Sequence, residues 1–230
     1  MCLNGPPDLR LWCPETGEVR LVPCRRLRCR PCLLWAGWRR GLAIADAAPE
    51  RFMTLTLVGE DWQIVRARMK RLRYDLVEEV GACDWVWSVE QNPAGTGHHV
   101  HAWQRGVFVP QARLSELADS KGMGFRVDVR RWRAESKGAE SYGLKGIGYG
   151  LKGSEGLEAA ATFLEVNGGR LTHQSAGFFE GGVRAAEARG VARARAAGEQ
   201  REWQLVNVAD LAAATSPAPR LTKGARDGQA

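Results

Sequence analysis

Apolar and polar residues alternate in two stretches of the segment 84–105, DWVWSVEQNPAGTGHHVHAWQR. A period of two predicts β-strands whose two faces differ in polarity. Between the two stretches, the sequence NPAGTG carries a proline and glycines, which interrupt a strand and favour a turn. The segment is therefore predicted to form two strands joined by a glycine-rich connection.

The residues on either side of this segment predict further strands and helices. The stretches 51–58 (RFMTLTLV) and 124–132 (GFRVDVRRW) are rich in β-branched residues or alternate in polarity, which predicts strands. Apolar residues recur every three or four positions in 60–80, and a shorter repeat follows Pro110 as far as residue 120, which predicts two helices. Together these elements predict an α+β fold in which helices pack on an antiparallel β-sheet.

The two ends of the chain differ in composition from the middle. In residues 1–40 the density of arginine, cysteine and proline argues against an ordinary helix or strand. Residues 156–166 and 181–206 have helical spacing, and 170–179 fits a short strand or an ordered loop. From residue 212 onward the composition is typical of a disordered tail.

These patterns divide the chain into three predicted regions. Residues 1–45 form a small cysteine-rich region, residues 46–180 form the main domain, and residues 181–230 form an alanine- and arginine-rich helix with a flexible tail. The chain has 230 residues, of which 44% are hydrophobic, so the main domain can bury a core of its own.

Charge and hydropathy narrow the classes of partner. No apolar run approaches the length of a membrane span and the N-terminus lacks the apolar core of a secretory signal, so we expect a cytoplasmic protein. The chain has 33 lysines and arginines against 26 aspartates and glutamates, a net charge of +7 that is compatible with a polyanionic partner. Nine tryptophans are present; most are expected in the core, but aromatic faces among basic residues can also stack unpaired bases.

Two histidines share one face of the second central strand. His99 and His101 are two residues apart, so they lie on the same side of the strand as Trp103. The short connection can bring Glu90, at the end of the first strand, beside them. Two imidazoles and one carboxylate leave open positions on a divalent ion that can also hold a substrate oxygen. The alternative is a chance pair of strand histidines with Glu90 exposed at a turn.

Four cysteines near the N-terminus have spacing that predicts a metal site. Cys13, Cys24, Cys29 and Cys32 follow the pattern C-x10-C-x4-C-x2-C, with arginines between the last three. Four thiolates can bind a structural Zn2+ ion and fold a segment too short for its own core. Cys2 can replace Cys13 as the fourth ligand. The alternative is a loop with unligated thiols, since disulfides are rare in cytosolic proteins.

The segment 140–153, ESYGLKGIGYGLKG, contains the sequence Y-G-L-K twice. On a helix Tyr142 and Tyr149 are two turns apart and point the same way, with Lys145 and Lys152 one turn further on. A tyrosine hydroxyl can attack a phosphodiester, and the covalent product conserves the energy of the broken bond for rejoining. A neighbouring lysine can neutralise transition-state charge or assist deprotonation. The alternative for either tyrosine is ordinary aromatic packing.

The chain resembles HUH endonucleases in three motifs, which occur in the same order. They are the sequence FMTLT, then Glu90 with HVH, then the tyrosine–lysine segment. More narrowly, the chain resembles the rolling-circle replication initiator (Rep) proteins of small single-stranded DNA phages and plasmids. The segments VPCRRLRCRPC and NGGRLTHQSAGFF resemble companion features of the phage-type group. The resemblance spans most of residues 13–179.

The resemblance implies a chemical role for each motif. The two histidines and Glu90 would hold Mg2+ or Mn2+, and Tyr142 or Tyr149 would be the nucleophile. The lysine that follows, Lys145 or Lys152, would be the assisting base. The implied reaction is attack on one DNA strand at a replication origin, giving a 5′-phosphotyrosine and a free 3′-OH that primes a host polymerase, followed by religation. The threonines of the first motif, Thr54 and Thr56, have no assigned chemical role.

The chain departs from the phage-type pattern in the tyrosine motif. Members of that group often have Y-x-x-K-Y-x-x-K, whereas here Gly146, Ile147 and Gly148 separate the two pairs. A spacing of seven residues keeps both hydroxyls on one face of a helix, which permits alternating use of two nucleophiles. If the glycines interrupt the helix, only one tyrosine can reach the metal.

Two other functions share part of these features. A zinc-stabilised, non-catalytic DNA- or RNA-binding regulator would explain the cysteines and basic residues, but it would not need Glu90, the HVH sequence and the tyrosine–lysine pairs together. An HUH transposase or relaxase would share the nicking step and differ in its biology. A separate helicase is a further possible partner of a replication initiator.

Overall fold

The computed structural model describes residues 9–13, 15–16, 19–21, 24, 27, 30–57, 62–91, 97–124, 126–132, 163–197 and 204–207. The predicted segments 140–153 and 212–230 lie outside these residues, as does most of 156–166. Within the described parts of the chain, no helix is both long and apolar enough to cross a membrane.

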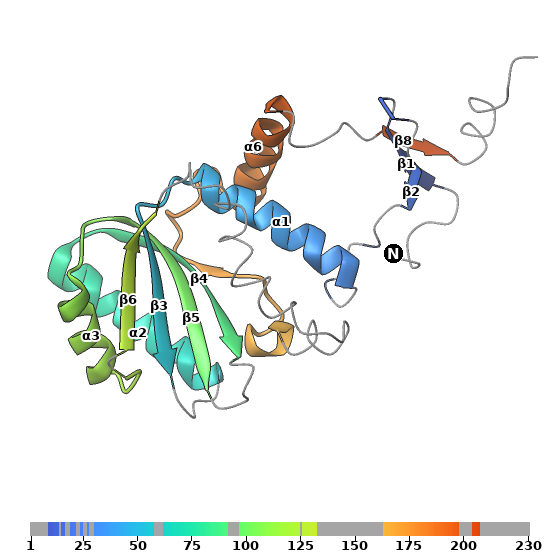
Figure 1. The fold of residues 1–230 in the computed structure, drawn as a ribbon. Coiled ribbons are helices and arrows are strands. Elements are labelled where there is room, and N and C mark those ends of the chain that lie inside the picture. The colour runs from blue at the N-terminus through green and yellow to red at the C-terminus, as the bar shows by residue number, and fades with distance from the viewer. Residues whose placement is uncertain are drawn as a thin grey trace, which may run out of the picture.

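A five-stranded antiparallel sheet forms the centre of the fold (Figure 1). Its spatial order is β6-β3-β5-β4-β7, and every neighbouring pair is antiparallel. The strands are β3 (Arg51–Leu57), β4 (Cys83–Gln91), β5 (His98–Gly106), β6 (Arg126–Arg131) and the two-residue β7 (His173–Gln174). The predicted α+β class and the four longer strands are confirmed, because local alternation of polarity specifies strands that have one face in the core.

Two helices cover one face of this sheet. These are α2 (Trp62–Val80) and α3 (Gln111–Ser120); Figure 1 shows α2 behind the strands and α3 beside the edge strand β6. Buried residues of α2, such as Leu72 and Leu76, join Leu55 of β3 and Val100 of β5 in the main hydrophobic core. Both helices are confirmed where the spacing of apolar residues predicts them, and Pro110 is the N-cap of α3.

A second pair of helices packs on the opposite face near one end of the sheet. These are α1 (Arg30–Asp46) and α6 (Val183–Ala196). Ile44 of α1 and Ala186 of α6 belong to one buried cluster with Phe52 of β3 and Trp103 of β5. This cluster does not extend to the other end of the same face, where the histidines lie.

The expectation that residues 1–40 contain no ordinary helix or strand is wrong. The helix α1 begins at Arg30, and β1 (Leu9–Trp12) and β2 (Val19–Leu21) are strands. Leu33, near the start of α1, is buried against Phe163, Leu164 and Leu171, which lie more than a hundred residues further along the chain. Tertiary packing therefore stabilises a helix that local composition does not indicate.

The helix predicted for residues 181–206 is also partly wrong. It ends at Ala196, and Gln204–Asn207 forms the strand β8, which pairs antiparallel with β1. Together β2, β1 and β8 form a second, three-stranded sheet, drawn apart from the central sheet in Figure 1. Leu205 and Val206 favour a strand once Leu9–Trp12 supplies a partner edge, and that partner lies at the other end of the chain. The division at residues 45 and 180 stays a prediction.

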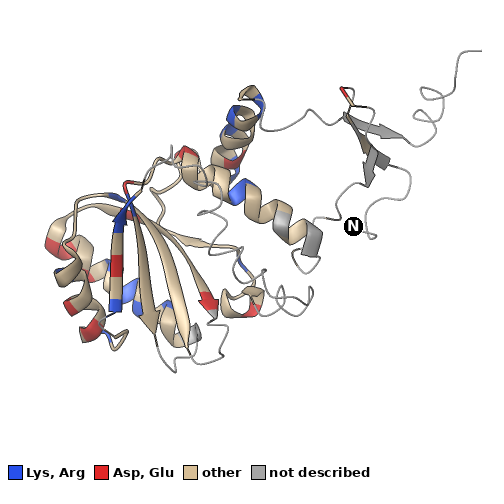
Figure 2. Ribbon diagram, viewed as in Figure 1, with Lys and Arg blue, Asp and Glu red and all other residues tan. Residues whose placement is uncertain are grey.

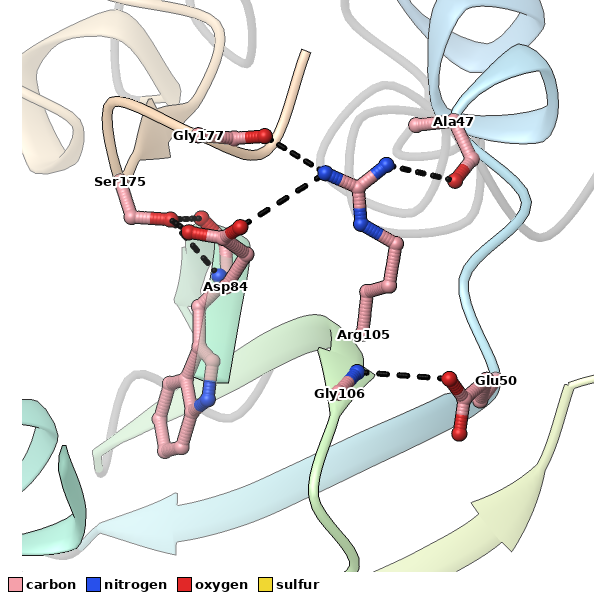
Figure 3. Close-up of polar contacts among 8 residues, drawn as sticks. Ala47, Glu50, Asp84, Arg105, Gly106, Ser175 and Gly177 are labelled. Carbon is pink, nitrogen blue, oxygen red and sulfur yellow. Dashed lines mark hydrogen bonds and ion pairs between the residues drawn. The ribbon is translucent and has the colours of Figure 1, made fainter. Parts of the chain in front are cut away.

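A set of polar contacts fastens the segment after β7 to the central strands, at the end of the sheet away from the histidines (Figure 3). Arg105 of β5 donates to the carbonyl oxygen of Gly177 at 2.6 Å, and Ser175 Oγ donates to Asp84 Oδ1 at 2.7 Å. A Cβ on Gly177 would lie 2.7 Å from Asp84 Oδ2, so a larger residue there would displace the Asp84 carboxylate. These contacts hold the start of β4 and the end of β5.

Candidate functional site

Two rows of polar residues cross the central strands on one face of the sheet. In the first row Thr56 of β3 is opposite His99 of β5, and His99 is opposite Glu90 of β4. In the second row Thr54 is opposite His101. Because side chains on a strand alternate between faces, residues two apart share a face, and both rows lie on the same side. The predicted grouping of two histidines with Glu90 on neighbouring strands follows from this register.

Glu90 is in direct contact with one of the two imidazoles. Its Oε2 atom lies 2.8 Å from His101 Nε2, and Glu90 is only 6% exposed. The rings of His99 and His101 have centroids 6.3 Å apart and planes inclined by 21°. The carboxylate and the two imidazoles therefore occupy one region near the ends of β4 and β5.

A threonine hydroxyl holds each imidazole at its other nitrogen. Thr54 Oγ1 lies 3.2 Å from His101 Nδ1, and Thr56 Oγ1 lies 3.2 Å from His99 Nδ1. A hydrogen bond at Nδ1 orients the ring and leaves Nε2 as the nitrogen that can bind a metal. The sequence placed these threonines beside the site without a role, and the structure gives them the role of orienting the rings.

Aromatic packing supports the same imidazole from the core side. The ring of Phe52 stacks on His101, with centroids 5.6 Å apart and an angle of 13° between planes. Phe52 in turn contacts Trp103 and Trp132 within the buried cluster beneath α1 and α6. The orientation of His101 therefore depends on the hydrophobic core as well as on Thr54.

Asn167 holds the strand that carries Glu90. Its side-chain amide donates to the carbonyl oxygen of Val89 at 2.7 Å and accepts from the Val89 amide at 2.8 Å. Asn167 is fully buried, and it also donates to the carbonyl oxygen of Phe163 at 2.9 Å. One side chain thus takes the place of a neighbouring strand where β7 no longer pairs with β4. The position of Glu90, one residue further on, is fixed by these hydrogen bonds.

The environment of His99 keeps its imidazole neutral. Burial lowers the pKa of His99 from its usual value, the nearby His101 lowers it further, and Glu90 acts in the opposite direction. A neutral imidazole has a lone pair available at one ring nitrogen, which is the form that binds a metal ion. When Nδ1–H donates to Thr56 Oγ1, the lone pair is on Nε2.

Glu90 and His101 have the chemistry and the spacing of two neighbouring ligands of a small divalent cation. Two adjacent ligands of an octahedral Mg2+ ion, each bound at about 2.1 Å, lie about 3 Å apart. The distance of 2.8 Å between Glu90 Oε2 and His101 Nε2 is close to that value. Among the residues that the structure describes, no group of three or more His, Cys, Asp or Glu side chains meets the requirements for holding an ion together. The contact between Glu90 and His101 is therefore the centre of the candidate site.

The other candidate catalytic residues lie outside the described residues. These are Tyr142, Tyr149, Lys145 and Lys152. The chain enters their segment after Trp132, at the end of β6, and is described again from Phe163. Asn167 is four residues beyond Phe163 and contacts Val89, so the chain returns beside the strand that carries Glu90.

The structure brings two of the predicted zinc ligands together. The sulfur atoms of Cys24 and Cys32 are 3.5 Å apart. Two thiolates bound to one tetrahedral Zn2+ ion at about 2.3 Å lie about 3.8 Å from each other, so this spacing suits a shared ion. Cys13 is buried, and Cys29 and the alternative ligand Cys2 lie outside the described residues.

Basic residues of the edge strand β6 border the histidine face. Arg126 is opposite Thr56, and Arg130 is opposite Phe52, so both lie on the same face as the histidines. Asp128 lies between them, and its Oδ2 is 2.7 Å from Arg130 Nε. Figure 2 shows this pattern as basic positions at both ends of β6 with one acidic position between them. Both arginines are exposed and can meet an anionic ligand that approaches the site.

Sequence reasoning missed two further residues of this region. The sequence predicts no structural role in the site for Asn167, because its partner Val89 is 78 residues away. Ser88 is fully buried opposite His101, and its hydroxyl has no hydrogen-bond partner among the described residues. The alternation that placed Glu90 also places Ser88 on the same face, two residues earlier, so that pattern could have identified it.

Comparison with protein-family models, with curated proteins and with solved structures gives no match for this chain.

Proposed function

We propose that the chain is a metal-dependent, single-strand-specific DNA nuclease and ligase of the HUH type, acting as a rolling-circle replication initiator. The observation that carries the proposal is the contact between Glu90 and His101, with each imidazole held at Nδ1 by a threonine of the first motif. The first two motifs of the resemblance thereby meet on one face of an antiparallel sheet.

The described residues supply binding and orientation. Glu90, His99 and His101 would hold Mg2+ or Mn2+, and Thr54 and Thr56 keep the ligand nitrogens in place. The bound cation would polarise a phosphate oxygen at the scissile bond. The exposed Arg126, in the same row as Thr56 and His99, can contact the DNA backbone beside that phosphate.

The covalent step would use a tyrosine of segment 140–153. The phenolic oxygen of Tyr142 or Tyr149 attacks the phosphorus, the bond from phosphorus to the 3′ oxygen breaks, and that oxygen leaves as a free 3′-OH after taking up a proton. Lys145 or Lys152 would accept the phenolic proton or neutralise charge on the transition state. The return of the chain at Asn167, next to Val89, supports placing this segment near Glu90.

The remaining parts of the proposal concern zinc and partners. A structural Zn2+ ion held by Cys24 and Cys32 together with Cys29 and Cys13 or Cys2 would stabilise the N-terminal region, and the 3.5 Å separation of the first two sulfurs supports it. The DNA partner would be a single-stranded replication origin. A host polymerase would extend the 3′-OH, with a helicase as a possible further partner.

The decisive feature of the chemistry is which DNA fragment remains on the protein. We expect the purified protein with Mn2+ to form a covalent adduct with a single-stranded library of randomised sequence that is labelled at its 3′ end. The same library labelled at the 5′ end gives no labelled adduct, since the 5′-phosphate of the downstream fragment joins the tyrosine.

Variants then separate the enzyme from a binding protein. Tyr142→Phe with Tyr149→Phe removes the adduct, and Glu90→Gln slows its formation while leaving binding of the library within a few fold, because phosphate contacts dominate affinity. An adduct that persists in the double variant, or a parent protein that never forms one, rejects the proposal. If the parent protein binds DNA but never forms an adduct, the non-catalytic regulator is favoured.

A further inference from the structure

A cavity lies at the end of the central sheet away from Glu90. It is formed by residues 49–51 where β3 begins, by Phe108 after β5, and by residues 129–132 at the end of β6. Its volume is about 740 Å3, which is within the range of pockets that hold small organic ligands. None of the described residues that line it is Glu90, His99 or His101.

The lining of this cavity is mainly basic. It contains three arginines, Arg51, Arg130 and Arg131, against the single carboxylate of Glu50. The guanidinium of Arg51 already has partners within the protein. It lies 3.2 Å from Glu50 Oε2 and donates to the carbonyl oxygen of Gly106 at 3.2 Å. Arg131 is exposed, and no carboxylate within the described chain pairs with it. Its guanidinium is therefore available to a phosphate group that enters the cavity.

The ring of Phe108 is exposed to solvent beside the arginines of the cavity. Phe108 is 56% exposed, and its ring lies over the guanidinium of Arg51, 4.8 Å from Cζ to the ring centroid. The contact holds the ring in place at the rim of the cavity. An exposed, fixed aromatic face next to arginines is the arrangement on which unpaired bases stack in proteins that bind single strands.

Arg51 and Arg131, opposite each other in the β3–β6 pair, lie on the other face of the sheet, and the cavity reaches the histidine face around the β6 edge, at Arg130. Arg130, in its lining, shares that face with Arg126, which is in the row of Thr56 and His99. Five residues of β3 separate Arg51 from Thr56, a distance of about 17 Å at the usual rise of an antiparallel strand. A DNA strand that passes the histidines can therefore run along the β6 edge and reach the cavity.

We infer that this cavity is a second binding site for the single-stranded DNA substrate, with a base stacked on Phe108 and its phosphate held by Arg131. The inference rests on the proposed function, since it names where the strand lies beyond the scissile phosphate. The site contributes to affinity and to the path of the strand, and it takes no part in cleavage. A polynucleotide is favoured over a free nucleotide because the basic positions continue toward the histidines.

Binding without metal tests the site independently of cleavage. The probe is a fluorescent oligo-dT of about 20 nucleotides, longer than the site of a typical single-strand binding fold, measured by anisotropy in EDTA. Phe108→Ala weakens binding at least about fivefold, as expected for loss of one stacked base. Arg131→Gln reduces the slope of log K against log salt concentration by about 0.7, the value for one phosphate contact on a single strand.

Matched variants control for loss of an aromatic ring and of a charge elsewhere. Tyr74 is 67% exposed on α2, and Arg113 lies on α3 in contact with Glu79. Tyr74→Ala and Arg113→Gln should bind the oligonucleotide like the parent. Circular dichroism and the melting temperature show whether each variant is folded.

Three results would overturn the inference. The first is unchanged affinity and salt slope in folded Phe108→Ala and Arg131→Gln proteins, and the second is equal loss in the two control variants. The third is dTMP displacing the oligonucleotide at concentrations where inorganic phosphate does not, with this displacement lost in Phe108→Ala, which would make the cavity a site for free nucleotides. Because adduct formation is not measured here, failure of the nuclease proposal would appear separately, as absence of the covalent product.

Discussion

At the scale of single residues, the candidate site depends on side chains that orient the two imidazoles. Thr54 and Thr56 each hold an imidazole at Nδ1, and Phe52 stacks on His101. These contacts restrict both rings before any ligand arrives. Pre-oriented ligands bind a cation more tightly because less conformational freedom is lost on binding.

Replacing a threonine by valine tests this orienting role. Thr54→Val keeps the shape of the side chain and removes the hydroxyl, so we expect Mn2+ affinity to fall about 10- to 100-fold, as for other groups that orient metal-bound histidines. Thr54→Ser retains the hydroxyl and should bind Mn2+ close to the parent value. The measurement is a Mn2+ titration followed by electron paramagnetic resonance. Equal affinity in the valine variant would show that the hydroxyl does not orient the ligand.

The lowered pKa of His173 predicts that the stability of the folded protein depends on pH. Burial, aided by the charge of Arg66, lowers the pKa of His173 to about 4, and its ring stacks on Trp87. Between pH 4 and about 6.5 the unfolded chain binds a proton that the folded protein excludes, so the stability of the fold rises with pH over this range. The stability contributed by the neutral ring is complete above about pH 6.5 and is lost as pH falls toward 4.

Substitution isolates this contribution from other titrating groups. The difference in unfolding free energy between the parent and His173→Gln should change by about 3 kcal/mol between pH 7 and pH 4, measured by urea denaturation. Gln174→Ala, at the exposed neighbouring position of β7, should follow the parent at every pH. A constant difference between the parent and His173→Gln would mean that the imidazole is protonated equally in the folded and unfolded states.

At the scale of elements, the packing of α1 against α6 depends on one glycine. A Cβ on Gly190 would lie 2.8 Å from the backbone of Leu42, so the two helices meet at this point without a side chain between them. In an exposed helix, changing glycine to alanine stabilises by about 1 kcal/mol. Here the close approach should reverse the sign, because the rigid backbone of α1 cannot move aside.

Two substitutions on the same helix measure this effect. We expect Gly190→Ala to lower the unfolding free energy, whereas Ala188→Gly at an exposed position of α6 should lower it by only about 1 kcal/mol through helix propensity. Chemical denaturation of both proteins gives the comparison. Stabilisation by Gly190→Ala would show that α1 and α6 do not pack as closely as described.

The edge of β4 depends in a similar way on Asn167. Its side chain makes three hydrogen bonds to buried backbone groups of Val89 and Phe163. Asn167→Ala leaves these groups without partners, and we expect a loss of at least about 3 kcal/mol in stability. Glu165→Ala, at an exposed position two residues earlier, should have little effect.

Hydrogen exchange gives the local test of the same contact. The amide of Val89 should exchange faster in Asn167→Ala than the amides of β4 that pair with β5. Uniform exchange rates along β4 in the variant would indicate that the edge near Glu90 has another support.

At the scale of the whole molecule, the central sheet was predictable from sequence and the N-terminal elements were not. Alternating polarity in β3, β4 and β5 is a local signal, and it also placed His99, His101 and Glu90 on one face. By contrast, β1 is stabilised by pairing with β8, nearly two hundred residues away, which no local pattern reveals. The same reason explains why the bonds of Asn167 to Val89 could not be predicted.

In the proposed function, one end of the central sheet serves in DNA cleavage and the other end binds the DNA strand. The histidine end carries the residues proposed to hold the metal, and the opposite end carries the cavity at Phe108 and Arg131. Basic residues of β6 join the two ends along one edge. This arrangement makes cleavage and strand binding separable by mutation, because no described residue belongs to both places.

The central claim is that a tyrosine of segment 140–153 becomes joined to the DNA end that the metal site cleaves. Mass spectrometry of the protease-digested adduct, formed with Mn2+ on single-stranded DNA, tests this claim most directly. We predict a nucleotide mass on a peptide that contains Tyr142 or Tyr149, with that product absent in Glu90→Gln protein over the same time. A nucleotide on any other residue, or no modified peptide from parent protein that binds the DNA, would contradict the account.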